Sequence, residues 1–377
     1  MPEEGKGVWT IAVFDGVWSN QQLMKDCGLV PYMFHRVYGF RPAMLGRSAG
    51  EEYTNLTKMP GMRLEFLPVS AEGYPDARLR FMREHSGEMD LLVLTGPYHE
   101  YTALLSEYRK LRPDGKVYMA LDMNSYWADS INRDDPWFTE LLGACDVIAA
   151  SCRRMQEELT RRWERWTIHT IPNGFVNLTG TPLSVSFEQK ENIILTVGRI
   201  GSAQKANHIL LEAFAAARPE IGDWRLHLVG KIDEPFRPYI DQYFAAYPEL
   251  RERVVFKGLI ADKAELYAEY ARAKVFALTS ILEGGAPNVV AEALFHGCYT
   301  VTSDIDAAGD ITADGACGRV FPCGDVPALA DIFREICPDG ALFRNAFPET
   351  VAYARRFYDW EVNIKRLYRL LYEGNKM

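Results

Sequence analysis

Short apolar runs recur along the first half of the chain, and two of them end directly before an aspartate. The runs cover Val8–Phe14, Leu91–Leu94, Val117–Leu121 and Val147–Ala150, with a weaker one at Arg63–Pro68. Each has the length of a strand that is buried on both faces of a parallel sheet. The segments between them, such as Tyr101–Leu111, carry apolar residues at helical spacing. This alternation predicts an open, doubly wound parallel sheet with α/β topology.

The same alternation starts again in the second half. Strands are predicted at Ile193–Val197, Arg225–Val229, Val254–Phe256, Val275–Leu278 and Tyr299–Val301. The polar stretch Thr179–Ser184, with its glycine and proline, marks the boundary between the two series. The apolar spacing from about Glu349 to Glu373 predicts one long helix at the end. We therefore expect two Rossmann-like domains, residues 1–180 and 181–350, followed by a C-terminal helix over 351–377.

Composition narrows the class of protein. The chain has 377 residues, 48% of them hydrophobic and 25% charged, which is typical of a globular protein of about two domains. Its net charge of −9 disfavours nucleic acid as a partner, because binding phosphates needs a surplus of Lys and Arg. The seven cysteines show no CxxC spacing, which favours reduced thiols over a metal site or disulfides. With no secretory-signal pattern and no apolar run long enough for a bilayer, we expect a cytoplasmic protein.

One segment of the second half predicts an anion site. In Ser280–Gly297 a strand end is followed by a glycine-containing turn and then by a helix that starts near Pro287 and Asn288. The start of a helix at the carboxyl edge of a sheet offers backbone N–H groups and a positive dipole end to an anion. Glu283 and Glu292 bracket this position. Because carboxylates accept hydrogen bonds from hydroxyls, this pattern fits a diphosphate with hydroxyls on both sides, as in a nucleotide sugar.

Cations for such a diphosphate are expected from the loop after the first strand of the second half. Arg199 follows that strand and a glycine, and Lys205 lies further along the loop. Arginine can bind phosphate oxygens with two hydrogen bonds, while lysine acts as a point charge. The residue types alone leave other interpretations open. Glu283 and Glu292 could be solvated acids, and Lys205 could be an ordinary surface lysine.

The order of these motifs resembles a known family. The pieces are Gly198-Arg199, Lys205, Leu210–Phe214, Glu283 with Glu292, and Phe357 with Trp360. Over roughly residues 140–372 they resemble the retaining GT-B glycosyltransferases of family four, the glycosyltransferase group 1 type. Eight residues separate the two glutamates, one more than in the family pattern. The resemblance implies two Rossmann-like domains that face each other across a cleft, with the C-terminal helix crossing back to the first domain.

The resemblance also implies roles for individual residues. Its catalytic group would be Glu283, Asp122, Arg199 and Lys205. Its donor-binding set would be Gly16, Arg199, Lys205, Gly258, Ile260, Glu283, Asn288, Val289 and Glu292. In this scheme the two cations bind the diphosphate, Glu292 the ribose and Glu283 the transferred sugar. Asp122, at a strand end of the first half, would lie near that sugar. It is equally suited to cap the next helix, and His99 is more readily a packed or exposed residue than a site residue.

The predicted activity is a retaining transfer of a sugar from a nucleotide-diphosphate donor, UDP-linked, to a glycan or a lipid-linked sugar. A phosphate oxygen of the donor would take the proton of the acceptor, with neither a metal nor a cofactor. Two alternatives stay open: a catalytically silent protein that binds nucleotide sugars or glycans, and a nucleotide-dependent oxidoreductase, which lacks its GxGxxG fingerprint here. The basic and aromatic stretch Arg153–Trp166 also leaves open a weak peripheral contact with the inner membrane face.

Overall fold

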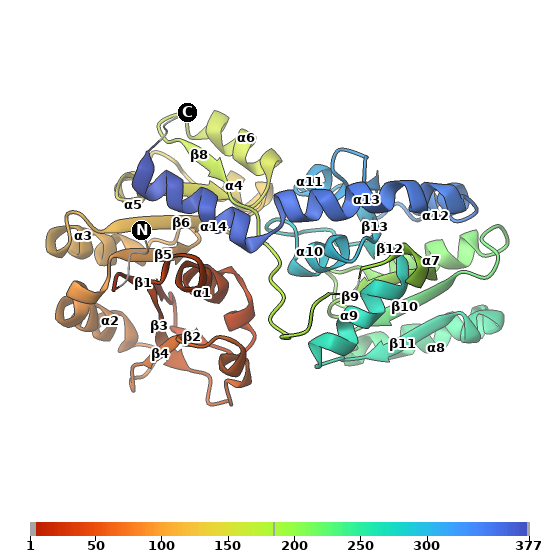
Figure 1. Cartoon of the computed structure of the whole chain (residues 1–377), viewed down its shortest axis with the longest axis horizontal. Helices are drawn as coiled ribbons and strands as arrows, with labels where there is room; N and C mark the ends of the chain where they lie inside the picture. The colour runs from red at the N-terminus through yellow and green to blue at the C-terminus, as the bar shows by residue number, and fades with distance from the viewer. Residues whose placement is uncertain (1–4, 184, 375–377) are drawn as a thin grey trace. The chain divides into compact units, whose positions relative to one another are not determined.

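The computed structural model describes residues 5–183 and 185–374. The chain divides into two compact units. The first consists of Met1–Leu178 together with Asp359–Met377, and the second is Thr179–Tyr358. In Figure 1 the first unit runs from red to yellow with its final helix in blue, and the second runs from green to blue.

The first unit is built on a parallel sheet, to which eight strands belong among the residues described. Their order is β2-β3-β1-β5-β6-β7-β8, with β4 paired to β3. The strands are β1 (Gly7–Ile11), β2 (Val17–Trp18), β3 (Arg41–Ser48), β4 (Arg63–Phe66), β5 (Leu91–Thr95), β6 (Lys116–Leu121), β7 (Val147–Ala150) and β8 (Ile168–Thr170). The helices are α1 (Asp26–Tyr38), α2 (Tyr74–His85), α3 (Tyr101–Leu111), α4 (Ser125–Ser130), α5 (Pro136–Gly143), α6 (Arg153–Arg162) and α14 (Trp360–Tyr368). Short helical turns are η1 (Gln22–Met24), η2 (Thr54–Lys58), η3 (Ser86–Glu88) and the π-helical turn η7 (Arg369–Glu373).

The apolar runs of the first half form the inner strands of this sheet. The strands predicted at Leu91–Leu94, Val117–Leu121 and Val147–Ala150 are confirmed, as is the weaker one beginning at Arg63. The first strand is shorter than predicted, since β1 ends at Ile11. Phe14 has a φ of 52°, in the left-handed region, and the amide of Gly16 closes a turn on the carbonyl of Val13 at 2.8 Å. This turn ends the extended chain before the apolar run is over.

The second unit repeats the architecture with a parallel sheet of six strands in the part of the chain described. Their order is β11-β10-β9-β12-β13-β14. The strands are β9 (Glu191–Val197), β10 (Arg225–Val229), β11 (Val254–Gly258), β12 (Ala273–Leu278), β13 (Tyr299–Ser303) and β14 (Gly318–Phe321). The helices are α7 (Asn207–Ala217), α8 (Arg237–Ala246), α9 (Lys263–Arg272), α10 (Asn288–Phe295), α11 (Ala308–Thr312), α12 (Val326–Ile336) and α13 (Gly340–Phe357). Short turns are η4 (Phe187–Gln189), η5 (Glu234–Phe236) and η6 (Pro248–Glu252).

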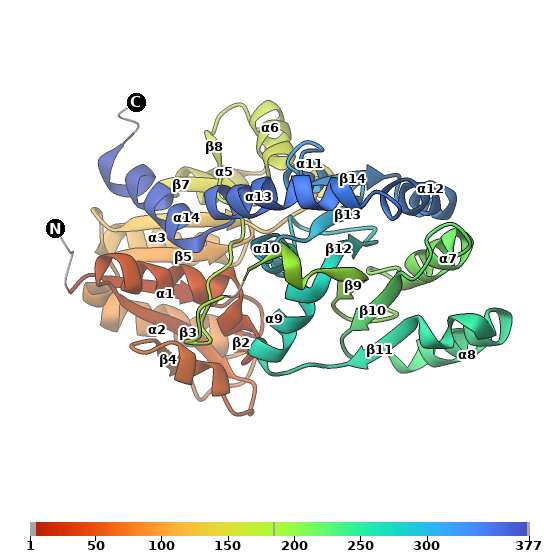
Figure 2. The same cartoon turned by 45° about the vertical axis from the view of Figure 1, so that its right-hand side comes forward.

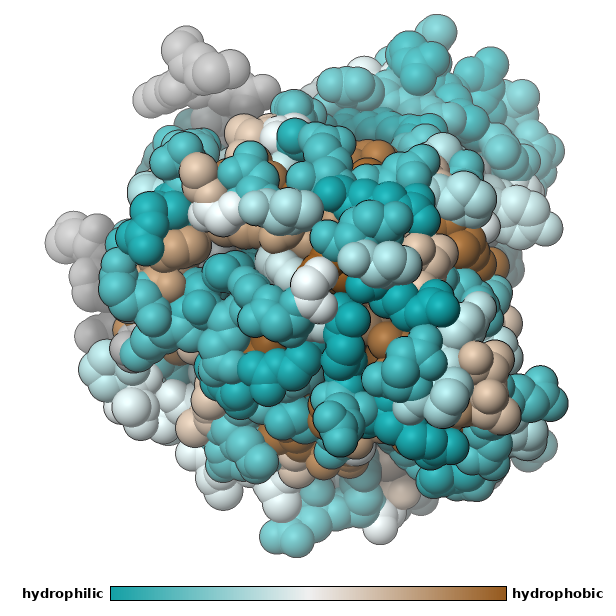
Figure 3. Space-filling model, turned by 90° about the vertical axis from the view of Figure 1, so that its right-hand side faces the viewer, coloured by the Kyte–Doolittle hydropathy of each residue, from teal (hydrophilic) through white to brown (hydrophobic). Residues whose placement is uncertain are grey.

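The outer helices of the second unit are amphipathic. Helix α12 buries Leu329, Phe333 and Ile336 in the core and leaves its other face to solvent. The face of the molecule on the side of α7, α8 and α12 is accordingly hydrophilic over most of its area, with hydrophobic residues in small separate patches (Figure 3). Within residues 5–183 and 185–374, none of the helices combines the length and apolar character needed to cross a membrane.

The prediction of one continuous helix from Glu349 to Glu373 is wrong. Helix α13 ends at Phe357, and α14 starts anew at Trp360. The side chain of Asp359 accepts a hydrogen bond from the amide of Glu361 at 2.7 Å, which caps the new helix. Helix α14 buries Trp360, Ile364 and Leu367 in the core of the first unit, where it packs on α1 (Figures 1 and 2). The end of the chain therefore completes the first unit.

Candidate active site

A tightly folded loop joins β9 to α7 in the second unit. The amides of Lys205 and Ala206 both donate to the carbonyl of Ser202, at 3.1 Å each. The side-chain oxygen of Asn207 accepts from the amide of Gly201 at 2.7 Å. Three residues of the loop have a positive φ, Gly198, Gly201 and Ala206. A backbone held at this many points keeps the side chains that it carries in fixed positions.

The loop brings one predicted cation directly to one predicted glutamate. Nζ of Lys205 lies 2.5 Å from Oε1 of Glu283, and the two side chains are only 16% and 11% exposed. The hydroxyl of Thr279, just after β12, donates to the carbonyl of Lys205 at 2.8 Å. The structure thus joins the carboxyl ends of β9 and β12, two neighbouring strands, by side-chain contacts.

Gln204 connects the remaining parts, and sequence reasoning missed it. Its Nε2 donates to the carbonyl of Leu282 at 2.9 Å and to Oε2 of Glu283 at 3.2 Å. Its Oε1 accepts from the guanidinium of the exposed Arg199 at 3.2 Å. A glutamine beside a lysine is an ordinary pair in sequence, so the only signal was its place directly before Lys205. Gln204 orients the loop of Glu283 against the loop that carries both cations.

Glu292 lies in the second turn of α10 and is held by two residues of α9. Nζ of Lys263 lies 2.5 Å from its Oε1, and the hydroxyl of Tyr270 donates to its Oε2 at 2.9 Å. Burial, reinforced by the charge of Glu292, raises the pKa of Tyr270 well above its usual value, so this phenol stays protonated as a donor. Sequence reasoning found neither Lys263 nor Tyr270. Their spacing of seven residues on α9 could have shown that they share one helix face.

The predicted strand, turn and helix at Ser280–Gly297 is confirmed. Pro287 is the N-cap of α10, Asn288 and Val289 form its first turn, and Gly297 follows its end with a φ of 72°. The start of a helix carries the positive end of the helix dipole and directs backbone N–H groups outward, which favours an anion at this position. Gly258 ends β11 with a φ of 70°, and the partly buried Ile260 follows it at the same carboxyl edge of the sheet.

Gly16, His99 and Asp122 belong to the first unit, at the carboxyl ends of β1, β5 and β6. Asp122 is exposed, and so is His99, whose ring meets Trp137 edge-on at 5.4 Å. Gly16 has a φ of 76°, and a Cβ there would lie 2.5 Å from the ring of Tyr74. Packing against Tyr74 is thus a structural reason for this glycine, and its approach to a diphosphate stays a prediction.

Asp26 is the first residue of α1, and the negative charge of Asp122 affects its pKa. Burial, together with the charge of Asp122, raises the pKa of Asp26 to about 6. A raised pKa means that the folded protein binds the proton more tightly than the unfolded chain. The stabilisation from Asp26 is therefore complete below about pH 4 and is lost as the pH rises through 6.

We expect Asp26→Asn to raise the free energy of unfolding at pH 7.5 by about 1–2 kcal/mol, because it removes a poorly solvated charge from a partly exposed site. The gain should shrink to nothing at pH 4. Urea unfolding at both pH values measures it. Asp76, exposed in the first turn of α2, gives the matched control. Asp76→Asn should instead cost roughly 0.3–1 kcal/mol at pH 7.5, through the helix dipole. A loss of stability for Asp26→Asn at pH 7.5 would contradict the assignment.

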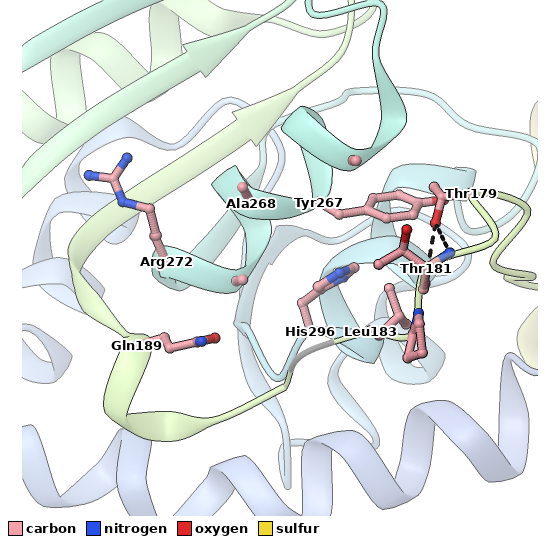
Figure 4. Close-up of a pocket in the computed structure, with 11 residues that line it drawn as sticks. Thr179, Thr181, Leu183, Gln189, Tyr267, Ala268, Arg272 and His296 are labelled. Atoms are coloured by element: carbon pink, nitrogen blue, oxygen red, sulfur yellow. Dashed lines mark hydrogen bonds between the residues drawn. The ribbon is translucent and has the colours of Figure 1, made fainter.

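A separate cavity of about 490 Å³ lies on another face of α9. Ala264, Tyr267, Ala268 and Ala271, which follow one another at helical spacing, form one wall of it. The ring of Tyr267 extends toward the segment that carries Thr179 and Thr181 (Figure 4). The hydroxyl of Thr179 donates a hydrogen bond to the carbonyl of Thr181 and accepts one from its amide. None of the predicted site residues lines this cavity. Lys263 and Tyr270, on the same helix, contact Glu292 instead.

Two parallel-sheet units, the second with cations and carboxylates at its carboxyl edge, define a protein of the GT-B fold class. Solved structures agree on the fold. The sucrose-phosphate synthase of Thermosynechococcus elongatus is similar with a TM-score of 0.69 at 20% identity, over 97% of this chain and 98% of that one. Anabaena HepE in complex with UDP has a TM-score of 0.71 at 17% identity, with the same coverage.

Residues 191–339, most of the second unit, match the family described as Glycosyl transferases group 1. The phosphatidyl-myo-inositol mannosyltransferase of Mycobacterium leprae is 29% identical over 242 residues, 62% of this chain and 60% of that protein. Its counterpart in Mycolicibacterium smegmatis is 26% identical over 219 residues, 56% and 55% of the two chains. The chain thus spans less than two thirds of the curated relatives that it matches. The resemblance to the group 1 glycosyltransferases, predicted from the sequence, is confirmed.

Proposed function

We propose that the protein transfers a sugar, with retention of configuration, from a nucleotide-diphosphate donor to a hydroxyl of a lipid-linked or glycan acceptor. The observation that supports this most is the connected group Arg199, Gln204, Lys205 and Glu283 at one edge of the second sheet. It offers two cations and a carboxylate beside the first turn of α10. The cations and the helix start suit a diphosphate, and the carboxylate suits the hydroxyls of a sugar.

The proposed reaction makes use of this charge arrangement. The bond between the sugar's anomeric carbon and the diphosphate breaks while the acceptor oxygen attacks from the same face. The acceptor proton passes to an oxygen of the leaving phosphate, so atoms and charges balance. Arg199, Lys205 and the amides of α10 stabilise the negative charge that develops on the leaving group. Glu283, oriented by Lys205 and Gln204, accepts hydrogen bonds from the transferred sugar, and Glu292, oriented by Lys263 and Tyr270, from the ribose.

Donor and acceptor can be identified in one set of assays. UDP-sugars are the first donors to test. GDP-mannose belongs beside them, because the mycobacterial relatives are named mannosyltransferases. Their names also make phosphatidylinositol the first acceptor to offer, in vesicles that would reveal a weak peripheral membrane contact of Arg153–Trp166. The test is release of the nucleoside diphosphate and appearance of a glycosylated product. A donor that binds and raises the melting temperature without any release would favour the silent binding protein.

We expect the transfer to proceed without a divalent metal, because Arg199 and Lys205 supply the positive charge that a metal would otherwise provide. Turnover should change less than about twofold when EDTA is added in excess, since the proposed charge stabilisation comes from side chains and amides alone. Activity that vanishes with EDTA and returns with Mn²⁺ would refute metal independence while leaving the glycosyl transfer itself standing.

A further inference from the structure

Three neighbouring strands of the first unit each place an aromatic ring at one spot on the carboxyl edge of the sheet. Phe14 follows β1, Tyr98 follows β5, and Trp127 lies in α4 after β6. The ring centroids of Phe14 and Tyr98 are 4.6 Å apart in an edge-to-face arrangement, and those of Tyr98 and Trp127 are 5.3 Å apart. We call these three rings the aromatic platform. Ligands of open α/β sheets bind outside this edge.

The backbone is adapted to present the first ring of the platform. Phe14 is 54% exposed and has a φ of 52°, a conformation that costs free energy for a bulky side chain. The turn is held by the bond from Gly16 to the carbonyl of Val13 and by the guanidinium of Arg47, which donates to the carbonyl of Asp15 at 2.8 Å. The surrounding structure thus holds an aromatic residue in a strained, exposed position. Such strain is characteristic of functional sites.

The other two rings are also positioned by local structure. Gly96 has a φ of 78°, and a Cβ there would lie 2.5 Å from the ring of Tyr98. The side-chain oxygen of Asn124 accepts from the amide of Trp127 at 2.8 Å and caps the helix that carries this ring. Each of the three loops therefore contains a feature that directs its aromatic side chain to the platform.

Carboxylates lie beside the rings. The exposed Asp122 directly follows β6. Burial, with added contributions from the charges of Asp122 and Glu100, raises the pKa of Tyr98, which places both acids near the platform. Asp122 acts in the same way on Asp26. This negative charge disfavours the binding of a phosphate or another anion. An acyl chain is disfavoured too, because it would displace the water that solvates these carboxylates.

We propose that the aromatic platform, together with Asp122, binds a neutral pyranose ring of the acceptor. The apolar C–H face of the sugar stacks on the rings of Phe14 and Trp127, and its hydroxyls donate hydrogen bonds to the carboxylate. This inference rests on the proposed function, since it names the class of acceptor that the glycosyltransferase uses. Free pyranosides should also bind in the absence of any donor.

Saturation-transfer NMR with the full chain and methyl α-D-mannopyranoside or methyl α-D-glucopyranoside tests the binding directly. Phe14→Leu and Trp127→Leu, two independent variants, remove one ring each, and each should weaken binding about five- to tenfold, the size of one aromatic contact. Phe14→Tyr should retain it. The control is Tyr126→Leu, which removes a neighbouring ring that is 76% exposed and for which no ring contact is found among the described residues. Unchanged saturation transfer in both leucine variants, or an equal loss in the control, would overturn the proposal.

Kinetics separate this inference from the proposed function. Phe14→Leu should raise the KM for a glycoside acceptor about five- to tenfold while the slow hydrolysis of the donor without acceptor stays unchanged. A structural defect would lower both the rate of transfer to the acceptor and the rate of donor hydrolysis. If the unmodified chain releases no nucleoside diphosphate from any donor, the proposed function fails, while the NMR experiment still decides whether the platform binds sugar. If both rates fall together in Phe14→Leu, the platform is not an acceptor site.

Discussion

Replacing Arg199 and Lys205 together by alanine is expected to lower kcat/KM for the sugar donor by about 10³-fold or more, because one lost group that stabilises developing charge already costs about 10²–10³. The physical reason is the leaving diphosphate, whose charge would then face only the first amides of α10. The fall should appear in both kcat and the affinity for the free nucleoside diphosphate, since both cations would contact it before and after transfer. Initial-rate kinetics and calorimetric titration with the nucleoside diphosphate measure the two.

The matched control removes two cations elsewhere in the same unit. Arg237 and Arg344 are more than half exposed and pair with Glu234 and Glu188 at 2.9 and 3.4 Å. The pair of substitutions to alanine there changes the net charge equally and should alter kcat/KM less than about twofold, since exposed ion pairs contribute little. If the variant lacking Arg199 and Lys205 melts like the parent and keeps a tenth of its kcat/KM, the proposed diphosphate site is wrong.

Glu269→Gln is expected to lower the free energy of unfolding at pH 7 by about 3 kcal/mol, as when one partner is removed from a buried ion pair. Glu269, on α9, is buried, and its carboxylate lies 3.0 Å from Nδ1 of His227 and 3.2 Å from Nζ of Lys257. These contacts, first that with His227, lower the pKa of Glu269 to about 2. Stabilisation from this carboxylate is present above pH 4.5 and is lost as the pH falls toward 2.

The difference between the variant and the parent should therefore shrink as the pH is lowered from 7 to 3, which urea unfolding at several pH values can follow. Glu249→Gln is the control. Glu249 is half exposed and pairs with Arg218 at 2.8 Å, so its loss should cost at most about 0.5 kcal/mol at any pH. A cost for Glu269→Gln that stays constant down to pH 3 would show that packing, rather than charge, makes this residue important.

Periodicity located the buried parallel strands but missed elements whose residues break the pattern. Strand β3 carries Pro42 and Gly46, two residues that normally argue against a strand, yet it is buried from Pro42 to Gly46 and pairs with β1. Neighbouring strands outweigh the local preferences there. The prediction of a single terminal helix was wrong for the opposite reason. Apolar spacing continues through Tyr358, and only the cap at Asp359 shows where one helix ends and the next begins.

The candidate site was predictable as far as it follows from strand ends. Arg199, Glu283 and Asn288 could be placed because the carboxyl ends of parallel strands share one edge of a sheet. The side chains that orient these residues could not be predicted in this way. Gln204 contacts Glu283 although 79 positions of the sequence separate them, and Lys263 contacts Glu292 over a separation of 29 positions. Such contacts depend on how α9 and the loops pack in three dimensions. Spacing along the chain can show that Lys263 and Tyr270 share one face of α9, but it does not show that this face meets Glu292.

The return of α14 to the first unit has a consequence for how the protein is made. The second unit, Thr179–Tyr358, is complete in sequence before Trp360, Ile364 and Leu367 have been synthesised. During synthesis, the sheet of the first unit keeps part of its apolar surface uncovered until α14 has left the exit tunnel of the ribosome. Stop codons or C-terminal truncations near Asp359 would thus harm the half of the protein that was translated earliest.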